Sequence, residues 1–274
     1  MNTPHEIDPA RLLEIVVLAV RTAGDHANAN RHRRMDTMMV AAHDVKLQLD
    51  LECQNIIWSL VRKHFPQHAI LAEESADKGQ PADDPHQSPY TWIIDPIDGT
   101  VNFSHGLPWW CCSVAVTYQG QTVAAAVYSP ATHELFTAAR GGTACCNGLP
   151  LAVAGTKALR DSMVLTGLDQ KSTELPQRLS RFQAISDAVQ KTRVIGAAAL
   201  DMCRVAAGQA DGYFEAGIYT WDVAAAGLIV ELAGGRVEIL DNPSPHRLVY
   251  MATNGHIHDE LKALINGLDC KRKT

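Results

Sequence analysis

Apolar residues near the start of the chain recur every three to four positions, the spacing of an amphipathic helix. Asp8 provides an N-cap for this helix, and Pro9 fits its first turn. The same period predicts a second helix from about Leu49 to His64, which Pro66 ends. The short basic run 31–34 between the two helices is typical of a solvated loop or helix face.

Short apolar runs bounded by turn residues predict strands in the first half of the chain. The run 69–72 ends in Glu73-Glu74, and the buried run 92–94 is predicted to stop at Asp95-Pro96. Further strands are expected at 113–118, 122–129 and 134–139, the first two joined by the hairpin signal Gln119-Gly120-Gln121.

Strands and helices alternate after about residue 150. Strands are expected at 163–166, 193–195, 212–215, 237–240 and 248–252, and helices at 174–189, 197–207, 220–233 and 258–265. The change of pattern predicts an N-terminal α+β subdomain of residues 1–150 and a C-terminal α/β subdomain of residues 151–274. Together they predict a mixed α/β (α+β) fold in which helices cover sheets.

Composition places the chain among globular proteins, with 46% hydrophobic and 20% charged residues in a length of 274. The net charge of −6 argues against a nucleic-acid partner, which would require a basic surface. No apolar run approaches the roughly 18–20 residues that span a bilayer. The first residues lack a signal-peptide pattern, so we expect a cytoplasmic protein without membrane contact. The seven cysteines include no C-x-x-C pair and are expected to be reduced.

Acidic residues stand where the predicted elements begin and end. Glu73 and Glu74 follow an apolar strand, Asp95 and Asp98 follow another, and Asp222 opens an apolar helix. Buried acids require positive compensation, and no lysine or arginine lies within 92–105. A hard divalent cation with oxygen ligands would supply it. The alternative for each acid is an ordinary capping role at a helix or turn.

The segment 95–103 combines features of a cation site with those of an anion site. Pro96 fixes a turn that lets two carboxylates and the Ile97 carbonyl converge. Gly99 permits close approach of the backbone to a ligand, and Gly99 and Thr100 can open a helix whose free N–H groups face an anion. A phosphate ester held on Mg²⁺ needs this combination. No Ser-His-Asp order or C-x₅-R loop is present, which argues against a covalent phospho-enzyme.

Three stretches of the chain, 71–75, 92–103 and 221–227, resemble the signatures of the inositol monophosphatase family, and they occur in that family's order. The resemblance implies a layered α-β-α-β-α sandwich of the inositol monophosphatase and fructose-1,6-bisphosphatase type. It implies a lithium-sensitive, Mg²⁺-dependent phosphomonoesterase that acts on inositol monophosphate or another small phosphorylated polyol or sugar. It also implies a homodimer.

The resemblance also assigns roles to matching positions. Glu73, Asp95 and the Ile97 carbonyl would hold one Mg²⁺, and Asp95, Asp98 and Asp222 a second. Glu73 would also touch a weaker third ion, a contact that Met39 puts in question because the family often has lysine there. Thr100 would lie beside the attacking water, with Asp50 orienting the Thr100 side chain. The backbone N–H groups of Gly99 and Thr100 would bind the phosphate. The positions implied to contact the substrate are Asp98, Ala198, Glu215 and Asp222.

Several alternatives stay open at this stage. Histidinol phosphate, fructose 1,6-bisphosphate and NADP are competing substrates, and a cationic substrate would use an acid near Glu215, for which Asp201 is a candidate. A dimeric partner-binding protein that keeps the fold is a further alternative. Trp109-Trp110 is expected to lie in the core or a dimer interface, and the pair His256 and His258 is not expected to bind metal. The segment 167–172 is expected to line the substrate mouth.

Overall fold

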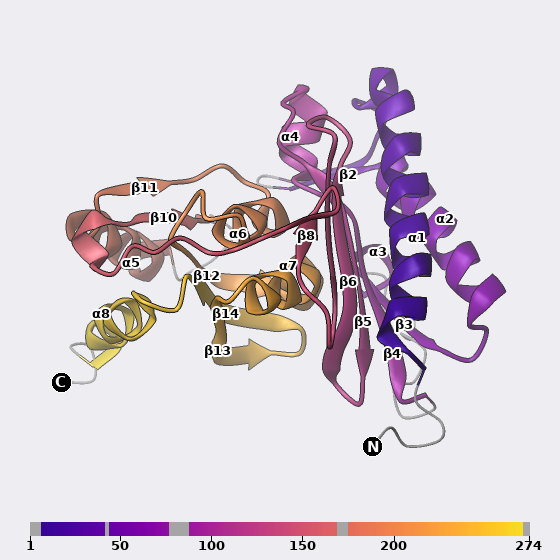
Figure 1. The fold of residues 1–274 in the computed structure, drawn as a ribbon. Coiled ribbons are helices and arrows are strands. Elements are labelled where there is room, and N and C mark those ends of the chain that lie inside the picture. The colour runs from indigo at the N-terminus through magenta and orange to yellow at the C-terminus, as the bar shows by residue number, and fades with distance from the viewer. Residues whose placement is uncertain (1–6, 42–43, 77–87, 169–174, 271–274) are drawn as a thin grey trace.

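The computed structural model describes residues 7–41, 44–76, 88–168 and 175–270 (Figure 1). Within these ranges, helices and sheets alternate in five layers, α-β-α-β-α, as the family resemblance implied. Figure 1 views the layers edge-on, from α5 and α8 on the left to α1 and α2 on the right. Three apolar cores fill the spaces between the layers.

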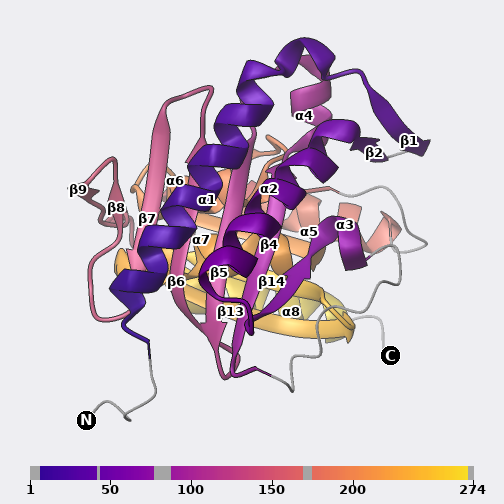
Figure 2. The same ribbon diagram turned by 90° about the vertical axis from the view of Figure 1, so that its right-hand side faces the viewer.

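The first layer consists of α1 (Pro9–Ala29) and α2 (Gln48–His64), which lie side by side (Figure 2). Asp8 caps α1 as predicted, because its Oδ1 accepts the Ala10 N–H at 3.0 Å. The apolar stripe of α1 is buried against the first sheet. A small hairpin of β1 (Thr37–Ala41) and β2 (Asp44–Leu47), together with a 3₁₀ turn η1 (Arg31–Arg33), connects the two helices.

The first sheet has seven strands in the order β3-β4-β5-β6-β7-β8-β9. Only the β3–β4 pair is parallel. The strands are β3 (Ala69–Ala72), β4 (Tyr90–Asp98), β5 (Cys111–Tyr118), β6 (Gln121–Ser129), β7 (Glu134–Ala139), β8 (Cys145–Cys146) and β9 (Leu149–Pro150). The predicted hairpin turn between β5 and β6 is confirmed, with φ of 50° at Gln119 and 82° at Gly120. Two short helices, α3 (Glu73–Ala76) and α4 (Thr100–His105), follow β3 and β4.

The middle layer contains α6 (Ala198–Ala206) and α7 (Thr220–Leu232), packed between the two sheets. Helix α7 is apolar on nearly all sides, as expected of a helix buried on two faces. The second sheet has the order β11-β10-β12-β14-β13. Its strands are β10 (Met163–Thr166), β11 (Lys191–Arg193), β12 (Gly212–Tyr219), β13 (Arg236–Ser244) and β14 (Arg247–Thr253).

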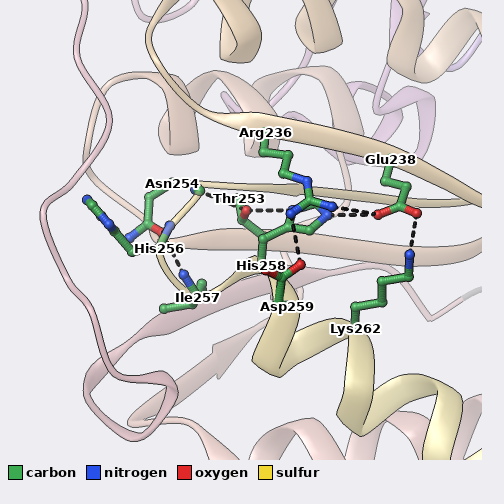
Figure 3. A network of polar contacts seen from close by, with 10 residues as sticks. Arg236, Glu238, Thr253, Asn254, His256, Ile257, His258, Asp259 and Lys262 are labelled. Carbon is green, nitrogen blue, oxygen red and sulfur yellow. Dashed lines mark hydrogen bonds and ion pairs between the residues drawn. The ribbon is translucent and has the colours of Figure 1, made fainter.

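The last layer contains α5 (Leu175–Ala188) and α8 (His258–Cys270), which cover the outer face of the second sheet; a 3₁₀ turn η2 (Leu159–Asp161) precedes β10. His258 is fully buried and joins α8 to the sheet (Figure 3). Its Nδ1 lies 2.9 Å from Thr253 Oγ1 and its Nε2 lies 3.0 Å from a Glu238 carboxylate oxygen. Both ring nitrogens are therefore engaged within the protein.

Several strand bounds were predicted wrongly: β12 continues to Tyr219 and β13 to Ser244, beyond the predicted ends at 215 and 240. Strand β4 does not stop at Asp95-Pro96 but continues to Asp98, and its register with β5 shifts between Asp95 and Asp98. Proline cannot donate to the ladder, so the sheet accommodates Pro96 in this irregularity. The strand predicted at 193–195 is Lys191–Arg193, because β10 pairs with those residues and the chain then leaves the sheet edge. The first residue of the helix predicted at 174–189 lies outside the described residues.

No helix among the described residues is long and apolar enough to cross a membrane. The six cysteines whose side chains are described are free thiols, as expected. Trp110 is buried against Phe103 in the core, with ring centroids 4.8 Å apart, which confirms the core alternative for this residue.

Candidate active site

A cavity of about 390 Å³ opens where β4, α4, α6, β12 and the start of α7 meet. Nine of the ten predicted site residues line it: Glu73, Asp95, Ile97, Asp98, Gly99, Thr100, Ala198, Glu215 and Asp222. The tenth, Asp50, is buried but does not line the cavity. No lysine or arginine occurs among the described residues that line the cavity.

Asp95 lies in β4 with its side chain inside the protein, only 2% exposed. Its Oδ1 atom is buried and has no hydrogen-bond partner within the described structure. Burial raises the pKa of Asp95 well above its ordinary value, and the nearby Glu73, Asp98 and Asp222 carboxylates raise it further. A buried carboxylate oxygen without a hydrogen-bond partner is unusual. A bound cation that accepts a lone pair of this oxygen would explain the missing hydrogen bond.

Asp98 connects β4 to the first turn of α6. Its two carboxylate oxygens accept the Ala198 N–H at 3.1 Å and the Ala199 N–H at 2.8 Å. Burial raises the pKa of Asp98 to about 6, although the hydrogen bonds from α6 and from the Cys111 thiol oppose this shift. The N-terminus of a helix favours the ionised carboxylate, so α6 helps to keep a negative charge in the cavity wall.

Asp222 and Glu73 reach the cavity from two different helices, α7 and α3. Asp222 is in the first turn of α7, where its Oδ2 accepts the Tyr219 N–H at 2.9 Å. Burial raises the pKa of Asp222 well above its ordinary value, and the charges of Glu73 and Asp98 add to the effect. Glu73 is half-buried at the start of α3, directly after β3. The mutual repulsion of these acids is the reason why a cation would bind here.

Glu74, the neighbour of Glu73, is buried outside this cavity. Its carboxylate lies 3.5 Å from the Lys46 ammonium, and its backbone N–H donates to the Gln54 amide oxygen at 3.1 Å. These contacts hold the short helix α3 against β2 and α2 and thereby position Glu73.

Gly99 forms a tight turn between β4 and α4. Its φ of +85° is in the left-handed region, and an added Cβ would lie 2.9 Å from the Trp109 carbonyl oxygen. The turn leaves the first N–H groups of α4 without helical partners at the edge of the cavity. Any larger residue at this position would strain the turn and displace its neighbours, so the turn favours glycine.

Asp50 does not contact Thr100 by a hydrogen bond in this structure. The Thr100 hydroxyl donates to the Ile97 carbonyl oxygen at 2.9 Å, and Asp50 Oδ2 accepts the Leu47 N–H at 2.8 Å. Burial raises the pKa of Asp50 well above its ordinary value, and the charge of Glu73 raises it further. Asp50 Oδ1 is a second buried oxygen without a hydrogen-bond partner within the described structure.

The cavity lining also includes Glu215 on β12 and Asp201 on α6. The Tyr213 hydroxyl donates to Glu215 at 2.5 Å, and the Trp109 indole N–H donates to Asp201 at 3.0 Å. Asp201 is 1% exposed, so the alternative of a helix-surface acid is excluded. Burial raises its pKa well above the ordinary value. Gly167 borders Glu215 so closely that a Cβ there would lie 2.0 Å from the carboxylate.

Sequence reasoning missed several cavity residues, chief among them Asn102. Its side-chain amide donates to the carbonyl oxygens of Trp109 and Ile195, each at 2.9 Å, and to that of Gly196 at 3.2 Å. This amide joins α4 to two loops that the sequence places far apart. Among the predicted substrate-mouth residues, Gly167 and Leu168 line the cavity, and 169–172 lie outside the described residues.

The chemistry of these residues fits a hard divalent cation. The wall offers carboxylate oxygens and the Ile97 carbonyl, which are the donors that Mg²⁺ prefers, and one buried oxygen without a partner. As the side chains stand, no group of three or more His, Cys, Asp or Glu among the described residues is arranged to hold an ion. Hydrogen bonds from α6 engage both Asp98 oxygens, and one from Tyr219 engages an oxygen of Asp222.

Comparison with known proteins gives the relatives of this chain. The sequence profile of the inositol monophosphatase family matches residues 8–272. A Pasteurella multocida protein named Nus factor SuhB is 39% identical over 230 residues, which cover 82% of this chain and 84% of that protein. An inositol-1-monophosphatase of Synechocystis is 39% identical over 226 residues, which cover 80% and 76%. The solved structure of an inositol monophosphatase from Anabaena has a TM-score of 0.79 at 33% identity, covering 94% of this chain and 96% of that chain.

Proposed function

Because this chain belongs to the inositol monophosphatase family, we propose that it is a Mg²⁺-dependent phosphomonoesterase that hydrolyses inositol monophosphate. Family and relatives support a phosphatase in general; the substrate and the metal are our proposal. The observation that carries it is the cavity in which four acids from β4, α3 and α7 face the Gly99–Thr100 turn. Such a cavity places possible cation ligands beside backbone N–H groups that can bind an anion.

The acids divide into two overlapping ligand sets. Glu73, Asp95 and the Ile97 carbonyl would hold one ion, and Asp95, Asp98 and Asp222 a second, with Asp95 shared. A third ion would be held weakly by Glu73. Paired divalent ions supply Lewis acidity and an activated water in hydrolases of this kind. The unpartnered Oδ1 of Asp95 supports its place between both sets.

The chain's own groups would bind and orient the ester. The N–H groups of Gly99 and Thr100 would donate to the phosphate oxygens, and the Gly99 turn brings them to the cavity edge. The Thr100 hydroxyl, which donates to the Ile97 carbonyl, has lone pairs that can accept a hydrogen bond from the attacking water and so orient it. Such positioning of reactants supplies a large part of the rate acceleration in phosphate hydrolysis.

The substrate hydroxyls would face Glu215, Ala198, Asp98 and Asp222. The Tyr213 hydroxyl fixes the orientation of the Glu215 carboxylate, which can then accept hydrogen bonds from a polyol. Inhibition by Li⁺, a homodimeric assembly, a cytoplasmic location and the subdomains 1–150 and 151–274 remain predictions from the family resemblance and the sequence.

The direct test is phosphate release from a substrate panel with Mg²⁺, with EDTA, and with Mg²⁺ plus millimolar Li⁺. The panel contains inositol 1-phosphate, histidinol phosphate, fructose 1,6-bisphosphate and NADP. We expect release only with Mg²⁺, fastest from inositol 1-phosphate, and inhibited by Li⁺. Histidinol phosphate is the sharpest competitor, because Asp201 and Glu215 place two acids on one wall of the cavity. No release from any ester would contradict the proposal, and faster release from another ester would reassign the substrate.

A second candidate function follows from the relative named Nus factor SuhB, which is as similar as the relative named inositol-1-monophosphatase. The chain would then also act as a partner-binding factor of that kind. The two functions separate in an Asp95→Asn variant. This variant should lose hydrolysis whether or not the protein also binds a partner. A binding role that needs only the fold would be retained.

A further inference from the structure

A second cavity, of about 590 Å³, lies at the end of the molecule where α1 and α4 both finish (Figure 2). Its lining includes Arg31, His32 and Arg34 after α1, His105 at the end of α4, and Gly106 and Leu107 after α4. Helix α4 separates the two cavities, because residues 99–102 face the acidic one and residues 103 and 105–107 face this one. No acidic residue occurs among the described residues of its lining.

The arginines of this cavity are not neutralised by the protein. Arg33, between them in sequence, pairs with Glu52 at 2.7 Å and Asp36 at 3.2 Å, and it does not line the cavity. Its neighbours Arg31 and Arg34 have no acidic partner within the described part of the chain. In a protein of net charge −6, a cavity that gathers unpaired cations is suited to a ligand of opposite charge.

Arg34 gives an independent indication of a missing acceptor. The guanidinium group packs against Gly106, where an added Cβ would lie 3.4 Å from Nε. That Nε is shielded from solvent and has no hydrogen-bond partner among the described residues. Because buried donors are nearly always satisfied, an oxygen from outside the chain is the simplest partner for this nitrogen.

We propose that this cavity is a binding site for a small anion with phosphate-type oxygens, separate from the catalytic cavity. Two guanidinium groups can each present paired N–H donors to such oxygens, and the histidines add polar contacts. The volume is in the range of about 300–1,000 Å³ that is typical of small-molecule sites. The exposed Leu107 on the rim and the buried Phe103 and Trp110 on the floor give it an apolar part, which fits an organic phosphate better than a bare ion.

Calorimetric titration with pyrophosphate in EDTA tests the proposal, since the metal-free acidic cavity repels anions. We expect saturable binding at one site per chain. The double variant Arg31→Gln/Arg34→Gln should weaken it on the order of tenfold or more. The matched double variant Arg11→Gln/Lys63→Gln removes the same charge from exposed positions outside the cavity and should bind like the wild type. Both variants should keep the wild-type rate of Mg²⁺-dependent phosphate release.

Three results would overturn the proposal. The first is a wild-type protein that takes up no pyrophosphate, or a double variant that binds it unchanged. The second is a change in sedimentation mass in Arg31→Gln/Arg34→Gln with unchanged anion affinity, which would assign these arginines to an interface between copies. The third is binding of a single-stranded RNA oligomer without binding of pyrophosphate, which would assign the cavity to a phosphodiester chain.

Discussion

At the scale of single residues, the cavity wall depends on a few buried polar groups that hold distant segments together. Asn102 is the clearest example, because one amide group bonds to carbonyl oxygens at 109, 195 and 196. Its neighbour Ser104 bonds only within the same helix, to the Val101 carbonyl at 2.8 Å. Substitution of each residue therefore compares the loss of a tertiary contact with the loss of a local contact on the same short helix.

Asn102→Ala should reduce the free energy of unfolding by about 1–3 kcal/mol, because the carbonyl oxygens of Trp109, Ile195 and Gly196 lose the hydrogen bonds from its buried amide. It should also lower phosphate release, since α4 carries the Gly99–Thr100 turn. Ser104→Ala, the control, should cost under about 1 kcal/mol and leave the rate unchanged. Urea denaturation and a phosphate-release assay measure both effects. Equal stabilities of the two variants would show that Asn102 does not connect the segments.

His68 predicts a pH dependence of stability. Its ring stacks between Phe65 and Tyr90, each at 4.6 Å, and its Nδ1 accepts the Trp92 indole N–H at 3.1 Å. Burial lowers the pKa of His68 to about 4 from its ordinary 6.5. Between these values the unfolded chain binds the proton and the folded chain does not, so stability falls as pH decreases through this window.

The loss attributable to His68 should be about 2 kcal/mol between pH 7 and pH 5. Other groups titrate in the same range, so the quantity to measure is the difference between the wild type and His68→Gln, which keeps an acceptor for Trp92. Urea midpoints at both pH values give this difference. Parallel pH profiles for the two proteins would exclude the proposed role of His68.

At the scale of elements, helices with a clear apolar period were predicted closely, because that signal is local. The helix predicted at 49–64 is Gln48–His64, and the one predicted at 220–233 is Thr220–Leu232. The end of β4 and the position of β11 were wrong, because partner strands decide them: β5 extends β4 past Pro96, and β10 pairs with 191–193. The hairpin β1–β2 was not predicted at all.

The residues of the site likewise divide into those that a local sequence signal predicts and those that depend on distant contacts. The acids that line the cavity could be found in the sequence, because they cluster at the ends of apolar runs that converge in this fold. The burial of Asp201 and the bonds of Asn102 could not be found, because both depend on contacts with residues more than 90 positions away in the chain.

The Gly99 turn, which joins β4 to α4, gives an element-scale prediction. Gly99→Ala combines the strain of a φ of +85° with a contact of 2.9 Å to the Trp109 carbonyl. Gly120 has a φ of +82° with no atom within 4 Å of an added Cβ, so Gly120→Ala measures the strain alone. We expect roughly 1 kcal/mol for Gly120→Ala and roughly 1–3 kcal/mol more for Gly99→Ala.

Thermal denaturation of the two glycine variants gives the comparison, and phosphate release should fall only in Gly99→Ala. If both variants lose the same stability and keep full activity, the close packing of the Gly99 turn is not what positions α4.

At the scale of the whole molecule, the acidic cavity exists only because the five layers bring distant segments together. Asp95 and Asp98 come from the first sheet, Asp222 from the middle helix layer, and Glu215 from the second sheet. Their mutual repulsion destabilises the folded chain, and bound cations would remove that repulsion. The metal centre and the assembled fold are therefore expected to stabilise each other.

The most direct test of this account is the rate of phosphate release from inositol 1-phosphate at saturating Mg²⁺ by Asp95→Asn, with Asp201→Asn as a control from the same cavity. The account predicts that Asp95→Asn lowers the rate by at least about 10²–10³-fold, because both ligand sets lose a shared oxygen. Asp201→Asn should keep Mg²⁺-dependent turnover and change chiefly the KM. A wild-type rate in Asp95→Asn would contradict the claim that these acids form the metal centre of a phosphatase.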